Sequence, residues 1–246
     1  MPSLSPLVGV VTPQGRADEV VQRVSEAINL GLLSDGEKLP AEPELAAQFG
    51  VAPMTVRDAL ATLREQGLVE TRRGRSGGSF VRRPSAPAAE PLRQQLVSMS
   101  VSELRDLADE HRAVAGESAR LAAERASAVN VRRLFSLTEQ LGAASALGDR
   151  IRADCRFHIE LAVASQSGRL TRREVGLQAE VSGLLWLPLG DDVDVAAHVA
   201  QHHAIAAAVV SENGSEARRL AESHVDRNLR RLTSLHLQLT SDGATP

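Results

Sequence analysis

Apolar residues recur every three or four positions in three successive segments near the start of the chain, residues 16–33, 41–49 and 53–66. This spacing places them on one face of an amphipathic helix, so we predict three helices that pack together through these faces. Gly50 separates the second segment from the third, and Gly67 follows the third, where a glycine commonly ends a helix. A short helix, a tight turn and a further helix are the order of a helix-turn-helix unit.

After Gly67 the pattern changes to two short apolar stretches, residues 68–71 and 79–81, which we expect to be strands. The basic, glycine-rich segment 72–78 between them is typical of a hairpin loop. Three helices followed by a β-hairpin describe a winged helix-turn-helix, with the loop as its wing. The next segment, residues 84–91, is rich in proline and alanine and has little apolar pattern, so we interpret it as a linker.

The rest of the chain, from residue 92 to residue 239, has helical periodicity nearly throughout. It contains no repeat of fixed period, and its interruptions are short, so we predict an antiparallel bundle of about six helices. The interruptions fall near Gly148, Ser167-Gly168, Pro188 to Asp192 and Asn213-Gly214.

The predicted fold class is therefore mainly α, with an N-terminal winged helix-turn-helix domain and a C-terminal all-α antiparallel helix bundle. The first domain has the size and order of a DNA-reading head, and the bundle is large enough to bury a core of its own. The boundaries that we predict are 1–83 for the first domain, 84–91 for the linker, 92–240 for the bundle and 241–246 for a disordered tail.

Composition narrows the function classes. The net charge of −3 excludes a polybasic protein that wraps nucleic acid, but it allows a local basic patch. Aromatic residues make up only 2% of the chain, so we do not expect bases to stack on an aromatic surface. The single cysteine, Cys155, excludes an intramolecular disulfide framework and a multi-cysteine zinc site.

We expect a cytoplasmic protein that has no membrane-spanning segment. No apolar run approaches the roughly 18 residues that a spanning helix needs. Residues 1–9 lack the basic start and the apolar stretch of a signal peptide, and a single cysteine fits a reducing compartment.

Basic side chains lie where a winged helix-turn-helix would meet double-stranded DNA. The third predicted helix presents its first residues to base edges, and among these Arg57 can bind guanine or phosphate while Thr55 can reach either. Arg72, Arg73 and Arg75 on the wing suit phosphate or minor-groove contacts. Each of these residues alone could be an ordinary surface residue, but the ordered set indicates DNA binding.

One aspartate and three histidines form a second candidate site. Asp154 and His158 are four residues apart, so on a helix they project from nearly one face, while His202 and His224 lie on two later predicted helices. A bundle core can gather such groups, and three imidazoles with one carboxylate suit zinc, nickel, cobalt or manganese. From spacing alone the alternative stays open, because the chain has seven histidines and a scattered histidine is usually an ordinary surface or core residue.

A set of short motifs in the predicted winged helix matches a known family. These motifs are Leu39–Ala46, Gly50–Val51, Thr55–Leu60, Leu63, Gly67–Val69 and Gly74–Val81. Through them, residues 16–82 resemble the winged helix of the GntR family. The resemblance implies a dimeric transcription regulator that places two heads on a pseudo-palindromic operator. Pro43 and Pro53 stand where the family commonly has DNA-contacting arginines, so we expect an unusual operator or weaker binding that relies on Arg57 and the wing.

Residues 92–240 resemble the helical effector domain of FadR-type regulators, the FCD domain, in its metal-binding version. The segment from Asp154 to His158, the segment from His202 to Ile205, and His224 carry this resemblance. It implies that Asp154, His158, His202 and His224 are the metal ligands, with His203 as the alternative to His202.

The remaining candidates are assigned as follows. Arg112 matches an arginine that the FCD domain usually places in its cavity, where it could pair with an anionic effector; its alternative is an exposed salt bridge on a helix. His198 and His236 match no ligand position, so we expect them at the surface. We interpret Cys155 as a packing residue, and Trp186 as part of the core or of a dimer surface, with a pocket wall as a weaker alternative.

The leading hypothesis is a repressor that leaves its operator when a small carboxylate metabolite binds a divalent metal in the helical domain. Zinc is the first expectation for the metal, with nickel or manganese as alternatives. A second hypothesis is a metal sensor, in which the metal itself is the signal. A third is a metalloenzyme fused to a DNA-binding head, but no Glu or His is evidently placed as a general base, so we expect no enzyme.

Overall fold

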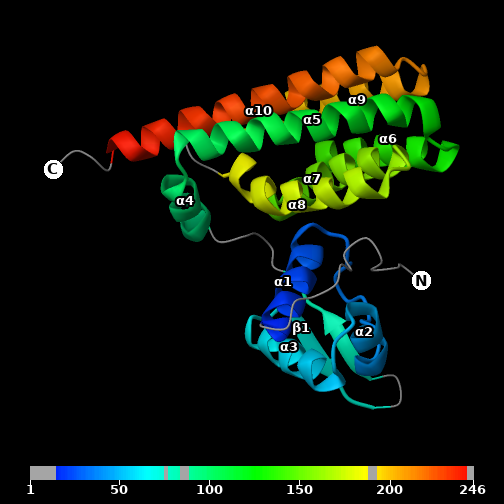
Figure 1. Ribbon diagram of the computed structural model, residues 1–246, viewed down its shortest axis with the longest axis vertical. Coiled ribbons are helices and arrows are strands. Elements are labelled where there is room, and N and C mark those ends of the chain that lie inside the picture. Colours follow the sequence, from blue (N-terminus) through cyan, green and yellow to red (C-terminus); the bar gives the residue numbers. More distant parts are fainter. Residues whose placement is uncertain (1–14, 75–76, 84–88, 188–192, 243–246) are drawn as a thin grey trace. The chain divides into compact units, whose positions relative to one another are not determined.

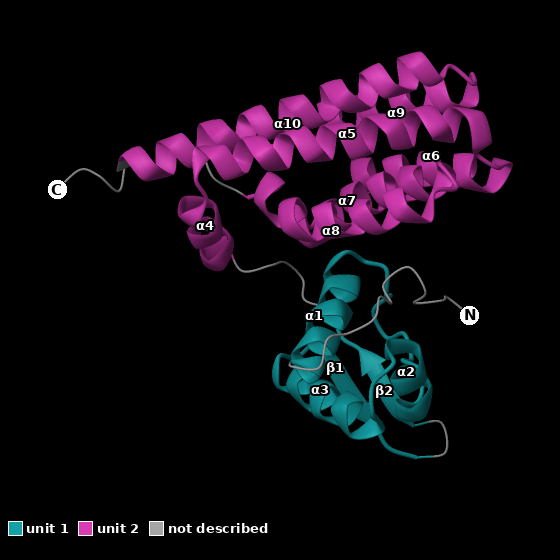
Figure 2. Ribbon diagram, viewed as in Figure 1, with its two compact units in different colours: residues 1–85 teal, residues 86–246 magenta. Residues whose placement is uncertain are grey.

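The computed structural model describes residues 15–74, 77–83, 89–187 and 193–242, and the chain divides into two compact units, residues 1–85 and 86–246 (Figure 2). Each unit has its own buried apolar core. In the part of the chain that the structure describes, no helix is long and apolar enough to cross a membrane.

In the described residues of the first unit, 15–74 and 77–83, there are three helices and a two-stranded antiparallel sheet (Figure 1). Val69 pairs with Val81 and Arg72 with Gly78, so the hairpin closes around the wing as predicted. The bounds differ from the predicted ones by only a few residues at each end. The elements are α1 (Arg16–Asn29), α2 (Glu42–Phe49), α3 (Pro53–Glu65), β1 (Val69–Arg72) and β2 (Gly78–Val81).

Local chemistry explains the turn between α2 and α3. Gly50 has a φ of 66°, in the left-handed region that favours glycine, and its N–H binds the carbonyl of Ala46. Ala52 then has an extended backbone, and Pro53 begins α3 in the first turn, where its missing N–H costs nothing. The buried faces of α1, α2 and α3 meet in one apolar core, which fixes α3 against the other two helices.

The second unit is a helix bundle in which the structure describes seven helices rather than the predicted six. In this unit α5 and α10 run side by side along much of their length, and α7 packs against α5, α6 and α8. The elements are α4 (Ala89–Ser98), α5 (Val101–Arg125), α6 (Ala128–Ala143), α7 (Leu147–Ala164), α8 (Gly168–Leu185), α9 (Val195–Val210) and α10 (Gly214–Asp242).

Serine caps explain the helix boundaries that the sequence analysis did not predict. Ser100 accepts a hydrogen bond from the Glu103 N–H at the start of α5, and Ser127 accepts one from the Asn130 N–H at the start of α6. Neither boundary carries a glycine or a proline. The first turn of α4 occupies the end of the predicted linker, and α10 extends into the predicted tail, whose last four residues lie outside the described part.

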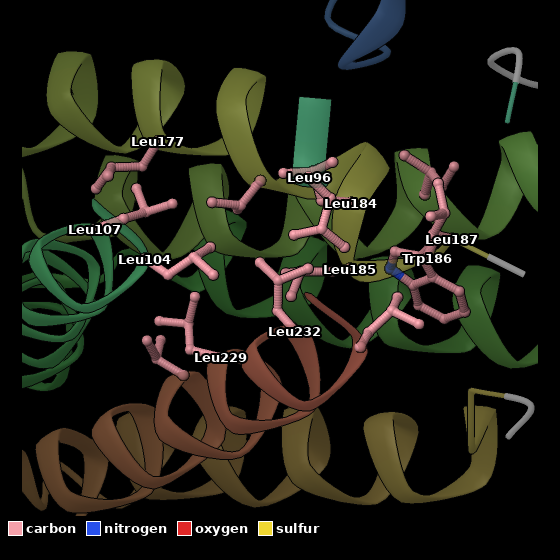
Figure 3. Close-up of a cluster of buried hydrophobic side chains, with 14 of the residues drawn as sticks. Leu96, Leu104, Leu107, Leu177, Leu184, Leu185, Trp186, Leu187, Leu229 and Leu232 are labelled. Atoms are coloured by element: carbon pink, nitrogen blue, oxygen red, sulfur yellow. The ribbon is translucent and has the colours of Figure 1, made fainter. Parts of the chain in front are cut away.

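The apolar core of the second unit surrounds a set of buried polar side chains. Figure 3 shows leucines from α5, α8 and α10 packed together, with Trp186 beside Leu187 at one end of the cluster. Among the described residues, the buried polar and charged side chains are histidines, acids, amides and hydroxyls, and none is a lysine or an arginine. Any positive charge in this interior must therefore come from an imidazolium or from a bound cation.

Candidate functional site

Three helices bring the predicted ligands together in the second unit. Asp154 and His158 come from α7, His202 from α9 and His224 from α10, and all four are buried. One ligand atom from each residue lies within 4.8 Å of the others. His203, the alternative to His202, is exposed and packs against the ring of Phe135 instead.

Buried atoms at the centre of this cluster lack hydrogen-bond partners. His202 Nε2 lies 3.4 Å from Asp154 Oδ1, and His224 Nε2 lies 3.2 Å from His158 Nε2. Asp154 Oδ1 and both ring nitrogens of His202 make no hydrogen bond. An unpaired buried polar group costs about 1–3 kcal/mol. Three nitrogens and a carboxylate oxygen at this spacing therefore fit a divalent metal, which would satisfy these atoms together.

Neighbouring side chains orient the cluster. Trp186 Nε1 donates to Asp154 Oδ2 at 2.9 Å, which leaves the other carboxylate oxygen directed at the histidines. His224 Nδ1 donates to Gln201 Oε1 at 2.7 Å, so the lone pair of the ring is on Nε2, which faces His158 and also lies 3.0 Å from Asn228 Nδ2. The ring of His202 stacks on Phe157, with 3.9 Å between the centroids and 5° between the planes. These contacts fix the ring planes and the carboxylate in place.

Electrostatics keep the three site histidines in the form that binds metals. Burial lowers the pKa of His158, although Asp154 acts in the opposite direction. Burial also lowers the pKa of His202 and His224 well below the usual value of 6.5, and the neighbouring histidines reinforce that shift. The imidazoles are therefore neutral near pH 7, with lone pairs available to a cation.

A second polar cluster lies beside His158, and the sequence analysis missed it. His111 on α5 and Glu174 and Gln178 on α8 are all buried. Glu174 Oε1 lies 3.4 Å from His111 Nε2 and accepts a hydrogen bond from Gln178 Nε2 at 2.8 Å. Burial acts to raise the pKa of Glu174, but His111, His158 and the hydrogen bond from Gln178 together hold this pKa below its usual value. The four-residue spacing of Glu174 and Gln178 was the only signal in the sequence.

The structure places Arg112 and His236 away from the positions first predicted for them. Arg112 is exposed and lies 3.9 Å from Glu222 and 3.8 Å from Asp226 on α10, which is the surface ion pair left open as its alternative. The prediction that His236 lies at the surface is wrong. It is buried where α10 packs on α4, and its Nδ1 donates to the Leu96 carbonyl at 3.0 Å.

Three other residues near the site can now be placed. His198, also expected at the surface, is half-buried and packs against Trp186. Cys155 is buried, as the packing interpretation requires, and burial raises the pKa of its thiol. Trp186 belongs to the core, as expected, but its hydrogen bond to Asp154 gives it a part in the site that was not predicted.

A surface pocket reaches His224, one member of the cluster of Asp154, His158, His202 and His224. It lies between α9 and α10, has a volume of about 290 Å³ and is lined by Gln201, Ser223, His224 and Arg227 together with three alanines and a leucine. The Gln201–His224 hydrogen bond therefore forms part of the pocket wall, so solutes can approach the site from this side.

The first unit presents the predicted DNA-contacting residues of α3. Thr55 is half-buried, and the neighbouring Met54 is 60% exposed. Arg57 is exposed, and its Nε and Nη2 donate to Glu42 Oε2 at 3.1 and 3.0 Å. This ion pair joins the first turns of α2 and α3 and holds the guanidinium at the end of α3 that a helix-turn-helix directs to DNA.

The wing carries exposed arginines. Arg72 donates to Glu70 Oε1 at 2.7 Å, and its guanidinium lies over the Phe80 ring, 4.3 Å from the centroid. Arg73 is exposed as well, and Arg75 lies outside the described residues. The described part of the wing thus directs positive charge toward solvent from a paired hairpin.

Comparisons with known proteins agree with this architecture. The family "Bacterial regulatory proteins, gntR family" matches residues 16–81, and the FCD domain matches residues 106–227. The "Putative HTH-type transcriptional regulator RmpR" of Mycobacterium gastri is 45% identical, covering 91% of this chain and 82% of its own. The "HTH-type transcriptional regulator LutR" of Bacillus subtilis is 29% identical, covering 80% and 92%. The solved structure "E. coli McbR/YncC" has a similar fold, with a TM-score of 0.55, 16% identity and 92% and 99% coverage.

Proposed function

Because this chain belongs to the gntR family of bacterial regulatory proteins and carries an FCD domain, we propose that it is a homodimeric transcription repressor controlled by a small carboxylate. The chain is a DNA-binding transcription regulator of the GntR/FCD type. The repressor role, the carboxylate effector, the metal and the dimer are the parts that we propose. The observation that carries the proposal is the buried cluster of Asp154, His158, His202 and His224.

In the proposed complex, α3 enters the major groove and the wing follows the backbone. Thr55 and Arg57 contact base edges or phosphates, and Arg57 exchanges its ion pair with Glu42 for DNA. Arg72, Arg73 and Arg75 bind phosphates or the minor groove, so that they supply affinity rather than sequence preference. Two subunits give two such heads, which suits a pseudo-palindromic operator.

In the second unit, Asp154, His158, His202 and His224 would hold a divalent metal, with zinc as the first candidate. Such a metal would supply a positive centre with an open position for the carboxylate of an effector. The hydrogen bond from Trp186 to Asp154 and the hydrogen bond between His224 and Gln201 would orient these two ligands toward the metal. The relatives bear the names of transcriptional regulators, which supports a binding role over turnover.

Control of DNA binding requires that the effector prefers one arrangement of the dimer. The four proposed metal-binding side chains come from α7, α9 and α10. An effector bound at the metal would therefore contact three helices of the bundle. A shift in how these helices pack would change the spacing of the two heads. The effect on operator affinity can only equal the difference between the effector's affinities for the two arrangements.

The test measures operator affinity and metal content on the same protein. The full-length chain is titrated against the intergenic DNA next to its own gene by fluorescence anisotropy, with and without zinc and a panel of carboxylates. We expect salt-dependent binding that a carboxylate weakens only in the zinc-loaded protein. The Asp154→Asn variant should lose both zinc and the carboxylate response. Asp149→Asn, an exposed change on the same helix, should keep both.

Each other result decides between hypotheses. Salt-insensitive or absent binding to that DNA contradicts the regulator mechanism for this site. If zinc alone changes operator affinity and no carboxylate does, the chain is a metal sensor. If a carboxylate acts equally on zinc-loaded and zinc-free protein, the effector binds elsewhere.

A further inference from the structure

Met54 is the most exposed of the large apolar side chains in the described residues, and it takes no part in the apolar core of the first unit. Its exposed fraction is 60%, and the other exposed large apolar side chains of the described residues all lie in the second unit. Methionine is flexible and polarisable, so it adapts to irregular surfaces and recurs where proteins bind partners. An exposed methionine in the first turn of a DNA-reading helix is therefore a candidate contact to DNA.

The geometry of α3 directs Met54 away from the core and toward the side of the helix that carries Arg57. Successive residues of an α-helix are rotated by about 100°, so Met54 lies about 160° from the fully buried Val56 and about 60° from Arg57. Arg57 is exposed, and Glu42 holds its guanidinium at the same end of the helix. Met54 therefore adds one more side chain to the surface that Thr55 and Arg57 present to DNA.

The first turn of α3 has little to offer a base by hydrogen bonding. Ala52 and Pro53 are exposed, and their side chains contain only carbon and hydrogen. Methionine has no donor, and its thioether is only a weak acceptor. Hydrogen bonds from side chains to bases therefore begin with Thr55 and Arg57. The residues before them can act only through apolar contact.

Only thymine presents a methyl group in the major groove. Guanine, adenine and cytosine show acceptors and donors there, whereas thymine adds its C5 methyl group to a single acceptor. Met54 would bury this methyl group favourably, but against another base it would cover an amino or carbonyl group without a partner. The side chain is also neutral, so it adds no attraction to phosphates. Its chemistry therefore favours thymine over the other three bases.

We propose that Met54 is a specificity-determining residue of the DNA head, and that it recognises the C5 methyl group of a thymine in each half-site of the operator. This inference rests on the proposed function, because it takes α3 to enter the major groove. It goes further in naming a base that the operator contains and the residue that selects it. Burial of one methyl group predicts about fourfold tighter binding for each half-site.

The test removes the methyl group and leaves every hydrogen-bonding group of the base in place. Deoxyuridine differs from thymidine only in this methyl group, so the intergenic DNA next to the gene is prepared once with thymine and once with uracil throughout. Full-length protein is titrated against both DNAs by fluorescence anisotropy. Wild type should bind the thymine DNA about 15-fold more tightly, because two half-sites contribute about fourfold each. Single thymine-to-uracil changes then locate the recognised position.

Variants assign the discrimination to Met54. Met54→Ala should bring the ratio between the two affinities to within about threefold, whereas Met54→Leu, which keeps an apolar side chain of similar size, should keep most of it. Leu237→Ala truncates an apolar side chain that is 51% exposed on α10, and it should keep the full ratio. Each variant should also keep the wild-type slope of log affinity against log salt concentration, because none removes a charge. Thermal unfolding should change little in Met54→Ala, because the side chain is exposed.

Four results would overturn the proposal. If wild type binds both DNAs equally, no thymine methyl group is recognised. If Met54→Ala keeps the wild-type ratio, another side chain recognises the methyl group. If Met54→Ala binds both DNAs more weakly by the same factor, Met54 contacts the sugar–phosphate backbone instead of a base. In these three cases the DNA-binding role stands, whereas absence of wild-type binding to either DNA removes the proposal together with the proposed function.

Discussion

Replacing Trp186 by phenylalanine separates the packing of this side chain from its hydrogen bond to Asp154. The indole is buried in the bundle core, and its Nε1 donates to Asp154 Oδ2 at 2.9 Å. Phenylalanine keeps an aromatic ring in the core but has no donor. The carboxylate of Asp154 then becomes free to rotate, and a metal would have to fix its orientation on binding.

The two losses have different magnitudes and appear in different measurements. Loss of an outer hydrogen bond to a metal ligand typically weakens metal binding by about 10- to 100-fold, which corresponds to about 1.4–2.7 kcal/mol. The smaller ring leaves a space of about three ring atoms in a fully packed core, which lowers the free energy of unfolding by about 2 kcal/mol. The first loss changes zinc affinity, and the second changes the stability of the metal-free protein.

Chelator competition measures zinc affinity, and thermal unfolding of the metal-free protein measures packing. Leu184→Ala is the matched control, because Leu184 lies in the same core cluster and its truncation costs about 2–5 kcal/mol. We expect Leu184→Ala to lower stability and leave zinc affinity within about threefold of wild type. If Trp186→Phe binds zinc as tightly as wild type, or if both variants lose affinity equally, the hydrogen bond does not orient Asp154 for a metal.

Other consequences concern the DNA head, the surface ion pair and acid stability. Arg57→Ala should weaken operator binding by about 1–3 kcal/mol in anisotropy titrations. Arg72→Ala should reduce the slope of log affinity against log salt concentration by about 1. An unchanged affinity or an unchanged slope would place the residue concerned away from DNA. Arg112→Ala should change the free energy of unfolding by less than about 1 kcal/mol in urea titrations, because the ion pairs of Arg112 are exposed. It should also leave effector affinity unchanged. A large loss of effector affinity would contradict the assignment of Arg112 to a surface ion pair. The metal-free protein should lose thermal stability between about pH 7 and about pH 5, because burial lowers the pKa of the three site histidines and the unfolded chain takes up protons first; a flat profile would contradict the assigned burial.

The first unit could be predicted closely because its signals are local. Gly50 and Pro53 specify the turn and the start of α3 through their own backbone preferences, so neighbouring residues in the sequence contain the information. In the second unit the Ser167-Gly168 and Asn213-Gly214 pairs mark the starts of α8 and α10, where Ser167 and Asn213 accept hydrogen bonds from the first turns. The starts of α5 and α6 depend instead on serine side chains, which are common within loops and helices alike, and the continuous apolar pattern concealed them.

The proposed metal ligands were predicted partly from local spacing and partly from the family resemblance. The four-residue spacing of Asp154 and His158 is a local signal, but only the resemblance to the FCD domain joined them to His202 and His224. The contacts that complete the site span larger separations: Trp186 and Asp154 are 32 residues apart, and Gln178 and His111 are 67 apart. Such pairs depend on how the helices pack, and no periodicity within one helix encodes them.

The interior of the bundle also explains why binding, rather than stability, accounts for its polar residues. Asp154 and Glu174 are buried in a unit whose described interior contains no lysine or arginine. Burying a carboxylate without a cation costs several kcal/mol, and leucines of similar size would pack there at no such cost. A divalent metal held by Asp154, His158, His202 and His224 would satisfy Asp154 Oδ1 and the His202 ring nitrogen that faces it, so part of its binding free energy would be stability that the metal-free bundle lacks.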